Sequence, residues 1–422
     1  MSQLSNGVNL AEDLVARGLV EHTSAPLETI LSKPRTVYLG VDPSADSMQA
    51  GNLVVVLLMK RLADAGHKIV LLVGGGTGMI GDPRESGERQ LSDSKTVAKN
   101  AKAIQAQMQA ITGKKVPVVN NADWLLKVKL VDFLRDIGKH FTVNELVKRD
   151  IIKRRLETAD ESISYTEFAY SLLQGYDYLV LNRTKGVDLQ IGASDQWTNI
   201  LSGVELIRRK EGKEAYALTC PLVTDAQGKK FGKSEGNAVW LDPKKTSPFT
   251  FYQFWIQQPD DMVEKYLKMY TFHPVAKLDE LMERHRAAPQ DREAQETLAR
   301  LVTETVHGPA ATAAAAAATS ALFGGKALKD LSRDERACLL AEIQTLPVSK
   351  ADVAKGYAVA DALAVSGLAS SKSEARRLIE GRGVTINGNP LDSVDPSVRI
   401  TDFDGDLAIL RKGKTPLILV LK

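Results

Sequence analysis

The chain has 422 residues, of which 44% are apolar and 25% charged, so its composition is that of ordinary globular protein and predicts two or three domains. The formal net charge of +3 is small, so a polyanionic partner would have to meet local clusters of basic side chains. Cys220 and Cys338 lack a partner spacing, which argues against a disulfide framework or structural zinc and favours a reducing, cytoplasmic compartment. No apolar run approaches bilayer length, and we expect no signal peptide, membrane association or resident metal.

The first predicted elements alternate between strand and helix. Residues 36–41 read as a buried strand, a polar turn over 42–52 follows, and an apolar helix occupies 53–65. A second strand over 69–73 runs into the glycine-rich segment 74–78. This alternation predicts an α/β fold with a doubly wound, Rossmann-like parallel sheet. Ligands of such sheets bind beyond the carboxyl ends of the strands, where both the polar turn and the glycine loop fall.

The polar turn leads into a helix start, which offers free backbone amides to a phosphate group. Gln49 and Asn52 can donate hydrogen bonds there without carrying charge, and Gly51 leaves room for a nucleotide to approach the backbone. Taken alone the pattern is weak, because Asn52 would serve equally as a helix cap.

A second group of polar side chains shares one face of a predicted helix over 165–177. Tyr170, Gln174 and Asp177 are spaced three or four residues apart, so they can line one pocket. The alternative is a core aromatic at Tyr170 and a solvated carboxylate at Asp177.

The polar loop over 225–237 carries Lys230 and Lys233 among three glycines. Lysine is a compact point charge with three rotatable donors, so such a loop suits phosphate charge that shifts during a reaction. The alternative is a solvated hairpin tip.

The chain turns helical over 247–346, where the alanine run 313–318 predicts a helix that ends near Gly324. A low-complexity linker is the alternative for that run. In the C-terminal part, Ser371 to Glu374 fits a capping box, and residues 384–389 predict a strand and an Asn-Gly hairpin turn. The basic side chains beside them, which suit an RNA backbone or else a solvated helix face, are Lys372, Arg376, Arg377 and Arg382.

Three of these segments, taken in order, resemble bacterial tyrosyl-tRNA synthetases, which are class I enzymes. They are the Asp-Pro-Ser-Ala-Asp-Ser turn, the Ile-Gly-Ala-Ser-Asp-Gln-Trp segment at 191–197 and Lys-Phe-Gly-Lys-Ser at 230–234, and the resemblance spans essentially the whole chain. It implies a Rossmann-like catalytic domain over 1–246, an α-helical anticodon-side domain over 247–346, and a small α+β RNA-binding domain of the alpha-L type over 347–422.

The resemblance also implies roles for individual residues, with 49–52 in the place of the family's HIGH signature and 230–234 in that of KMSKS. One departure is that Gln49 stands where the family usually has histidine, so it can donate a hydrogen bond but not carry charge. The implied catalytic residues are Gln49, Asn52, Lys230, Lys233 and Ser234. The implied tyrosine-binding residues are Tyr38, Asp82, Asn121, Tyr170, Gln174, Asp177 and Gln196. The implied ATP-binding residues are Gly40, Asp42, Ser44, Gly51, Gly192, Asp195 and Lys233. The implied tRNA-binding residues are the four basic side chains named above.

The activity so implied is tyrosine–tRNA ligation with L-tyrosine, ATP and tRNA as substrates, Mg²⁺ entering with ATP, and no tightly bound cofactor. The family is homodimeric, and the apolar segment 131–137 suits either an interface or a core helix. Three alternatives stay open: a tryptophanyl-tRNA synthetase, a non-catalytic RNA-binding paralogue, and a simple nucleotidyl transferase with a borrowed RNA domain.

Overall fold

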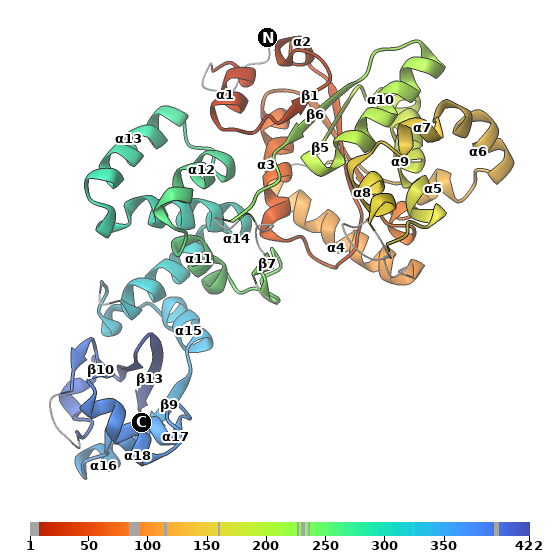
Figure 1. Cartoon of the computed structure of the whole chain (residues 1–422). Coiled ribbons are helices and arrows are strands. Elements are labelled where there is room, and N and C mark those ends of the chain that lie inside the picture. Colours follow the sequence, from red (N-terminus) through yellow and green to blue (C-terminus); the bar gives the residue numbers. More distant parts are fainter. Residues whose placement is uncertain are drawn as a thin grey trace. The chain divides into compact units, whose positions relative to one another are not determined.

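The computed structural model describes residues 8–83, 93–113, 116–158, 161–225, 228, 233–234, 237–323, 325–391 and 396–422. The chain divides into two compact units (Figure 1). The first combines residues 1–245 with 258–298, and the second combines 246–257 with 299–422. The boundaries of the three domains expected from the sequence stay a prediction.

A six-stranded sheet forms the centre of the first unit, with strand order β1-β6-β5-β2-β3-β4. Its strands are β1 (His22–Thr23), β2 (Thr36–Val41), β3 (Lys68–Val73), β4 (Val118–Asn120), β5 (Leu189–Ala193) and β6 (Tyr216–Cys220). All neighbours pair in parallel except β1, which pairs antiparallel with β6 at the edge. The strand order reverses between β2 and β5, so the predicted doubly wound α/β sheet is confirmed.

Helices cover both faces of this sheet. In Figure 1 its strands run between α3 (Ala50–Asp64) on one side and α9 (Tyr165–Lys185) with α10 (Trp197–Glu211) on the other. Helix α3 connects β2 to β3, whereas α9 leads into β5 and α10 connects β5 to β6. The other helices of the unit are α1 (Leu10–Ala16), α2 (Leu27–Ile30), α4 (Ser94–Thr112), α5 (Ala122–Leu125), α6 (Leu130–Asp136), α7 (Val143–Leu146), α8 (Asp150–Glu157), α12 (Asp260–Tyr270) and α13 (Val275–Ala287).

The start of α3 is held by its own side chains and by a distant segment. The helix begins at Ala50, earlier than the predicted residue 53, because the Oδ1 of Asn52 accepts the backbone N–H of Gln49 at 3.2 Å and turns the chain into the helix. The Ala50 N–H donates to the carbonyl of Val239 at 2.9 Å, and Leu241 N–H donates to the carbonyl of Met48 at 2.9 Å. The residues after the lysine loop therefore fix the position of this helix start.

A buried charge cluster ties α1 to α3 and to the end of α12. The guanidinium of Arg17 lies 2.8 Å from Asp13, and that of Arg61 lies 3.4 Å from the same carboxylate. Arg17 also donates to the carbonyl of Thr271 at 3.1 Å. Each of the three charged side chains is at most 5% exposed, so the cluster is fully desolvated.

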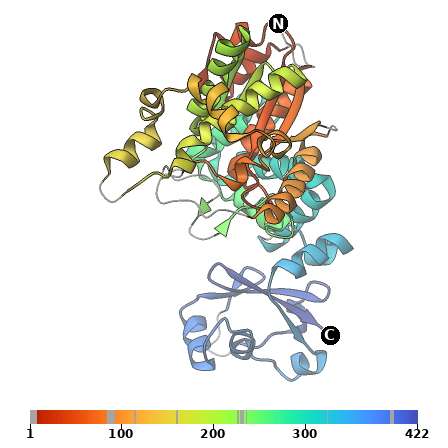
Figure 2. The same cartoon turned by 90° about the vertical axis from the view of Figure 1, so that its right-hand side faces the viewer.

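The second unit contains a helical part and a five-stranded sheet of order β11-β10-β12-β13-β9. Its elements are α11 (Pro248–Ile256), most of α14 (Glu293–Leu322), α15 (Arg333–Glu342), β9 (Thr345–Val348), α16 (Lys350–Ala354), α17 (Val359–Val365), α18 (Lys372–Glu380), β10 (Val384–Ile386), β11 (Asn389–Pro390), β12 (Leu407–Lys412) and β13 (Thr415–Leu421). Figure 2 shows the strands of this sheet on one side of the C-terminal part and its helices on the other. The alanine run is helical and α14 ends at Leu322, as predicted, although Gly308 and Pro309 kink the helix.

The C-terminal motifs form with one change. Asn387 and Gly388 have positive φ angles and join β10 to β11, which confirms the Asn-Gly hairpin. Ser371 caps α18 as predicted, by accepting the Glu374 N–H at 3.2 Å. The capping box also predicts that the Glu374 side chain accepts the N–H of Ser371, and this part of the prediction is wrong. The Glu374 carboxylate instead accepts the N–H of Ser370 at 2.7 Å, one residue earlier, and the Ser370 hydroxyl. Among the described residues, no helix combines the length and apolar character needed to cross a bilayer.

Candidate active site

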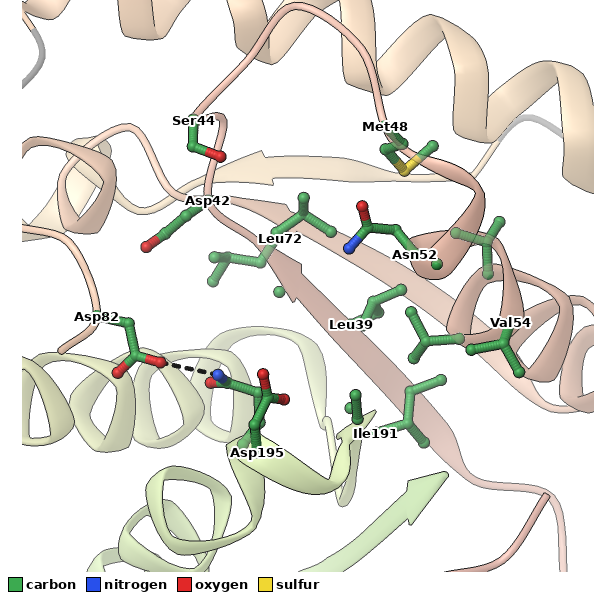
Figure 3. Close-up of a pocket in the computed structure, with 18 of the residues that line it drawn as sticks. Leu39, Asp42, Ser44, Met48, Asn52, Val54, Leu72, Asp82, Ile191 and Asp195 are labelled. Carbon is green, nitrogen blue, oxygen red and sulfur yellow. Dashed lines mark hydrogen bonds between the residues drawn. The ribbon is translucent and has the colours of Figure 1, made fainter. Parts of the chain in front are cut away.

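A cavity of about 420 Å³ opens in the first unit at the carboxyl ends of β2 and β5, where the strand order reverses. Figure 3 shows Asp42 and Ser44 beyond the end of β2, Asn52 at the start of α3, and Asp195 across the cavity. The residues singled out from the sequence that line it are Tyr38, Gly40, Asp42, Ser44, Gln49, Gly51, Asn52, Asp82, Tyr170, Gln174, Asp177, Gly192, Asp195 and Gln196. Residues from stretches of chain that lie far apart in the sequence therefore meet at one site.

The remaining candidates of this unit are placed differently. Asn121 does not line the cavity but lies behind its floor, bonded to Asp177. Lys230 falls outside the described residues. For Lys233 and Ser234 only the backbone is described: they form β7 (Lys233–Ser234), which pairs antiparallel with β8 (Asn237–Ala238). The roles expected for these three residues stay predictions.

Two buried polar side chains, Tyr38 and Asp177, form the floor of the cavity. They are 1% and 2% exposed, and within the described part of the chain the Tyr38 hydroxyl makes no hydrogen bond of normal geometry, although the Gln190 side chain lies close to it. The Asp177 carboxylate accepts the side-chain amide of Asn121 at 2.9 Å and the indole N–H of Trp124 at 2.7 Å. Burial raises the pKa of Asp177 to about 8, although both donors act against the rise. Such a floor suits a ligand that brings its own hydroxyl group.

A chain of hydrogen bonds joins this floor to the end of β2. The Asn121 amide also donates to the Thr77 hydroxyl at 2.8 Å, and Thr77 donates to Asp42 at 2.7 Å. The polypeptide backbone passes close to Asp42 at Gly74. A Cβ atom on residue 74 would lie 2.0 Å from the Asp42 carboxylate. Only glycine fits there, which explains part of the glycine-rich segment after β3.

Tyr170, Gln174 and Asp177 reach the cavity from one face of α9, as their spacing predicts. The Tyr170 hydroxyl donates to Asp42 at 2.8 Å. Burial and the nearby Asp42 raise the pKa of this phenol well above its usual value, so it stays protonated. Because its proton is engaged by Asp42, its oxygen is left to accept a hydrogen bond from a ligand.

Asp82 presents a carboxylate on the opposite side from the helix start (Figure 3). Its Oδ2 accepts the amide of Gln196 at 2.8 Å, and its Oδ1 accepts the amide of Asn199 at 3.0 Å. Burial raises its pKa to about 6, against the effect of both amides. A carboxylate so placed suits a cationic ligand group.

Several residues of the site were not predicted from the sequence. Gln190 and Trp240 line the cavity, while Thr77 lines it and also bridges Asp42 and Asn121. Trp124 and Asn199 orient the two carboxylates from behind. The signal for Asn199 was present, because it follows Gln196 by three residues and so shares its helical face. Trp124 lies on a short helix after β4 with no local pattern that indicates its partner.

The basic cluster expected to contact RNA lies in the second unit, on α18 and just after it. All four side chains are exposed. Lys372 forms an ion pair with Asp361 at 2.6 Å, while Arg382 has a φ of 54°, in the left-handed region, after α18 ends. The cluster is therefore accessible to a polyanion.

Residues 31–324 match a family model described as "tRNA synthetases class I (W and Y)". A second model, of the tyrosine–tRNA ligase SYY-like C-terminal domain, matches residues 341–420. A tyrosine–tRNA ligase of Roseiflexus castenholzii is 44% identical over 416 residues, which is 96% of this chain and 97% of that protein.

Solved structures give the same result for the fold. A C-terminally truncated mitochondrial tyrosyl-tRNA synthetase of Aspergillus nidulans superposes with a TM-score of 0.67 at 30% identity, covering 74% of this chain and 94% of that one. A tryptophanyl-tRNA synthetase of Plasmodium falciparum superposes with a TM-score of 0.52 at 14% identity, covering 78% and 89%, which shows a shared fold alone.

Proposed function

This chain belongs to the class I tRNA synthetases for tyrosine and tryptophan, and on that premise we propose how its cavity carries out the reaction of a tyrosine–tRNA ligase. The overall reaction joins L-tyrosine to tRNA at the expense of ATP. The assignment of residues below goes further than the family and is argued from the contacts of this chain.

The floor of the cavity recognises the phenol of tyrosine. The observation that carries this assignment is the buried pair of Tyr38 and Asp177. The Tyr38 hydroxyl can donate, and the Asp177 carboxyl group, with a pKa of about 8, can accept and when protonated can also donate. A substrate hydroxyl bonds to both, whereas phenylalanine brings no partner for the Tyr38 hydroxyl and leaves Asp177 with only its bonds from Asn121 and Trp124. The indole of tryptophan has one donor and no acceptor, so it would leave the Tyr38 donor without a partner. The pair therefore favours tyrosine over both.

The other end of the amino acid meets Asp82 and α9. The ammonium group donates to the Asp82 carboxylate, to the Tyr170 oxygen and to the amide oxygen of Gln174. Gln196 orients Asp82 from the side, at 2.8 Å. These acceptors line the same cavity as the floor pair, so one tyrosine molecule can reach both sets.

ATP occupies the part of the cavity between β2, β5 and the start of α3. Ser44 contacts a phosphate, and Asp195 accepts a ribose hydroxyl. Gly40, Gly51 and Gly192 leave room for the nucleotide beside the backbone. Asp42 lies between this region and Tyr170, which it holds in place. Mg²⁺ enters with ATP as part of the substrate.

The first step is attack of the tyrosine carboxylate on the α-phosphorus of ATP. A bond forms between the carboxylate oxygen and phosphorus, the bond from that phosphorus to the bridging oxygen of the β-phosphate breaks, and pyrophosphate leaves with the electron pair. No general base is required, because the attacking carboxylate is already ionised at neutral pH. The rate therefore depends on positioning and on donors to the departing charge. Gln49, Asn52, Lys230, Lys233 and Ser234 supply these donors. In the second step a hydroxyl oxygen of the terminal ribose of tRNA attacks the carbonyl carbon of the tyrosyl-adenylate. The bond from that carbon to the phosphate oxygen breaks, AMP leaves with the electron pair, and the hydroxyl proton is released to solvent.

The chain acts as a homodimer in this proposal. Helix α6 buries Phe133 and leaves an apolar face exposed, where Leu130 and Val131 are 71% and 73% accessible. Leu126 and Val143, on either side of α6 in the chain, are exposed as well. An apolar surface of this kind suits association with a second copy. The cytoplasmic location expected from the sequence stays a prediction.

The test is exchange of labelled pyrophosphate into ATP. We expect exchange that depends on tyrosine and is unchanged by added tryptophan, and a Lys233→Ala variant of intact fold that forms adenylate at a much lower rate. An RNA-binding paralogue would show no exchange, and a simple nucleotidyl transferase would show exchange without tyrosine. Either result would overturn the proposal.

A further inference from the structure

Arg149 stands at a position where arginine does not help its own helix. It is the N-cap residue of α8, where a side chain that accepts hydrogen bonds stabilises the helix start. A guanidinium can only donate, and Arg149 makes no side-chain cap bond. Its side chain reaches α10 instead, where Nη1 donates to the Oδ1 of Asn199 at 3.1 Å and Nη2 contacts the Ser202 hydroxyl.

These contacts determine which way the Asn199 amide faces. Because a guanidinium cannot accept, the amide must present its oxygen to Arg149 and its NH₂ group to the other side. That NH₂ group donates to the Oδ1 of Asp82 at 3.0 Å and to the Oε1 of Gln196 at 3.3 Å. Asn199 is 7% exposed, so water does not compete for either end of its amide.

Asp82 thus has one oriented donor on each oxygen, from Asn199 at Oδ1 and from Gln196 at Oδ2. The remaining lone pairs of both oxygens are left for a cation in the cavity. We propose that Arg149 is a positioning residue for tyrosine: through Asn199 it holds the Asp82 carboxylate in the orientation that receives the substrate ammonium group. This inference rests on the role of Asp82 in the proposed function.

Loss of the guanidinium would leave the Asn199 oxygen buried without a donor, and the amide would be held only at its NH₂ end, by Asp82 and by the Gln196 Oε1 at 3.3 Å. An amide held at one end is free to tilt, so the donor to the Asp82 Oδ1 would lose its fixed direction and Asp82 would shift from its place. The lost interaction lies at the amino-acid end of the cavity and acts on binding, so the KM for tyrosine rises while the KM for ATP and kcat stay near their values. Burial of Arg149 lowers its pKa to about 10, so it remains charged at neutral pH.

The experiment measures tyrosine-dependent pyrophosphate exchange without tRNA, so contacts of Arg149 with RNA cannot contribute. We expect Arg149→Met to raise the tyrosine KM by about 3- to 10-fold, the effect of one lost buried hydrogen bond. Arg149→Lys, which keeps a donor, restores much of the loss. The matched control is Lys148→Met, which removes the neighbouring exposed charge and leaves the KM unchanged. In an Asn199→Ala background, Arg149→Met adds no further rise, because its effect passes through the amide.

Three results would overturn the inference. The first is an unchanged tyrosine KM in Arg149→Met. The second is an equal rise of the tyrosine and ATP KM values together with a lower Tm, which marks a structural role. The third is full additivity with Asn199→Ala. Asp82→Asn separates the two levels of failure: if it leaves the tyrosine KM unchanged, the role of Asp82 in the proposed function is wrong and this inference falls with it. If Asp82→Asn raises the KM and Arg149→Met does not, only this inference is wrong.

Discussion

The indole of Trp124 donates to the carboxylate of Asp177 at 2.7 Å from behind the cavity floor. The indole nitrogen is donor-only, so it fixes the carboxylate without competing for a substrate proton. Together with the Asn121 amide at 2.9 Å, it leaves Asp177 oriented toward Tyr38 and the cavity.

Selectivity for tyrosine should depend on this floor. We expect Tyr38→Phe and Asp177→Ala each to lower the ratio of kcat/KM for tyrosine over phenylalanine by roughly 10- to 100-fold, because each removes one partner of the substrate hydroxyl. Competition assays by pyrophosphate exchange measure the ratio. The matched control is Tyr178→Phe, which removes a buried hydroxyl that bonds to the Tyr216 carbonyl at 2.8 Å. Unchanged selectivity in both floor variants would refute the assignment.

The affinity for tyrosine should fall in mild acid. The pKa of Asp82 is raised to about 6 by burial, with the carboxylates of Asp42 and Asp195 adding to the rise. Below that pH the carboxyl group becomes protonated and cannot pair with the ammonium group, so the Kd for tyrosine should rise about tenfold per pH unit. Equilibrium dialysis without ATP measures this directly. Asp82→Asn should bind weakly at every pH, and a flat wild-type profile down to pH 5 would contradict the role of Asp82.

Charges on the apolar face of α6 should separate the proposed dimer. We expect Leu130→Asp combined with Val131→Asp to give monomers in sedimentation experiments, because two carboxylates would be desolvated at the interface. The matched control is Val365→Asp, at a valine of the second unit that is 68% exposed. A double variant that still sediments as a dimer places the interface elsewhere.

The basic cluster of α18 should act on the RNA step alone. We expect Arg376→Ala combined with Arg377→Ala to raise the KM for tRNA and to weaken its dependence on salt, since fewer counterions are released on binding. Pyrophosphate exchange, which needs no RNA, should be unaffected. Equal losses in both assays would mean that these arginines support the fold and not RNA binding.

The buried cluster around Asp13 should be essential for stability. Asp13→Asn leaves the Arg17 and Arg61 guanidinium groups buried without a counter-charge, which costs about 3–5 kcal/mol. The pKa of Arg61 is already lowered to about 9 by burial and by the neighbouring Arg17. Thermal unfolding should show a clear fall in Tm, whereas Glu12→Gln, at the adjacent exposed carboxylate, should leave the Tm within a degree or so.

Local patterns in the sequence predicted two of the six strands of the sheet, β2 and β3, whereas most of the cavity residues were named from the family resemblance. The strand over 36–41 matches β2, and the spacing of Tyr170, Gln174 and Asp177 placed them on one helical face. The residues missed are those whose partners lie far away in sequence. Trp124 acts on Asp177 across 53 positions, and no periodicity in a short helix reveals that contact.

The starts of α3 and α8 also show which contacts the sequence can and cannot predict. Asn52 was open to two interpretations, and the structure has its oxygen capping α3 while its amide faces the cavity (Figure 3). A side chain with two ends can serve both purposes, which a pattern of residue types does not distinguish. Arg149 is not a residue type that is usually found at an N-cap. The reason for it is its contact with Asn199 on α10, which the sequence does not predict.

The reversal of strand order between β2 and β5 also has a consequence for how the chain is made. The central strand β2 pairs on one side with β3, which follows soon after it, but on the other side with β5, which begins only at Leu189. During synthesis from the N-terminus, the side of the cavity formed by β2 and α3 therefore stays incomplete until α9 and β5 have emerged from the ribosome. Pairings of such long sequence separation form late and slowly. We expect nascent chains that end before Leu189 to be protease-sensitive around β2 and to associate with chaperones that shield exposed apolar strands.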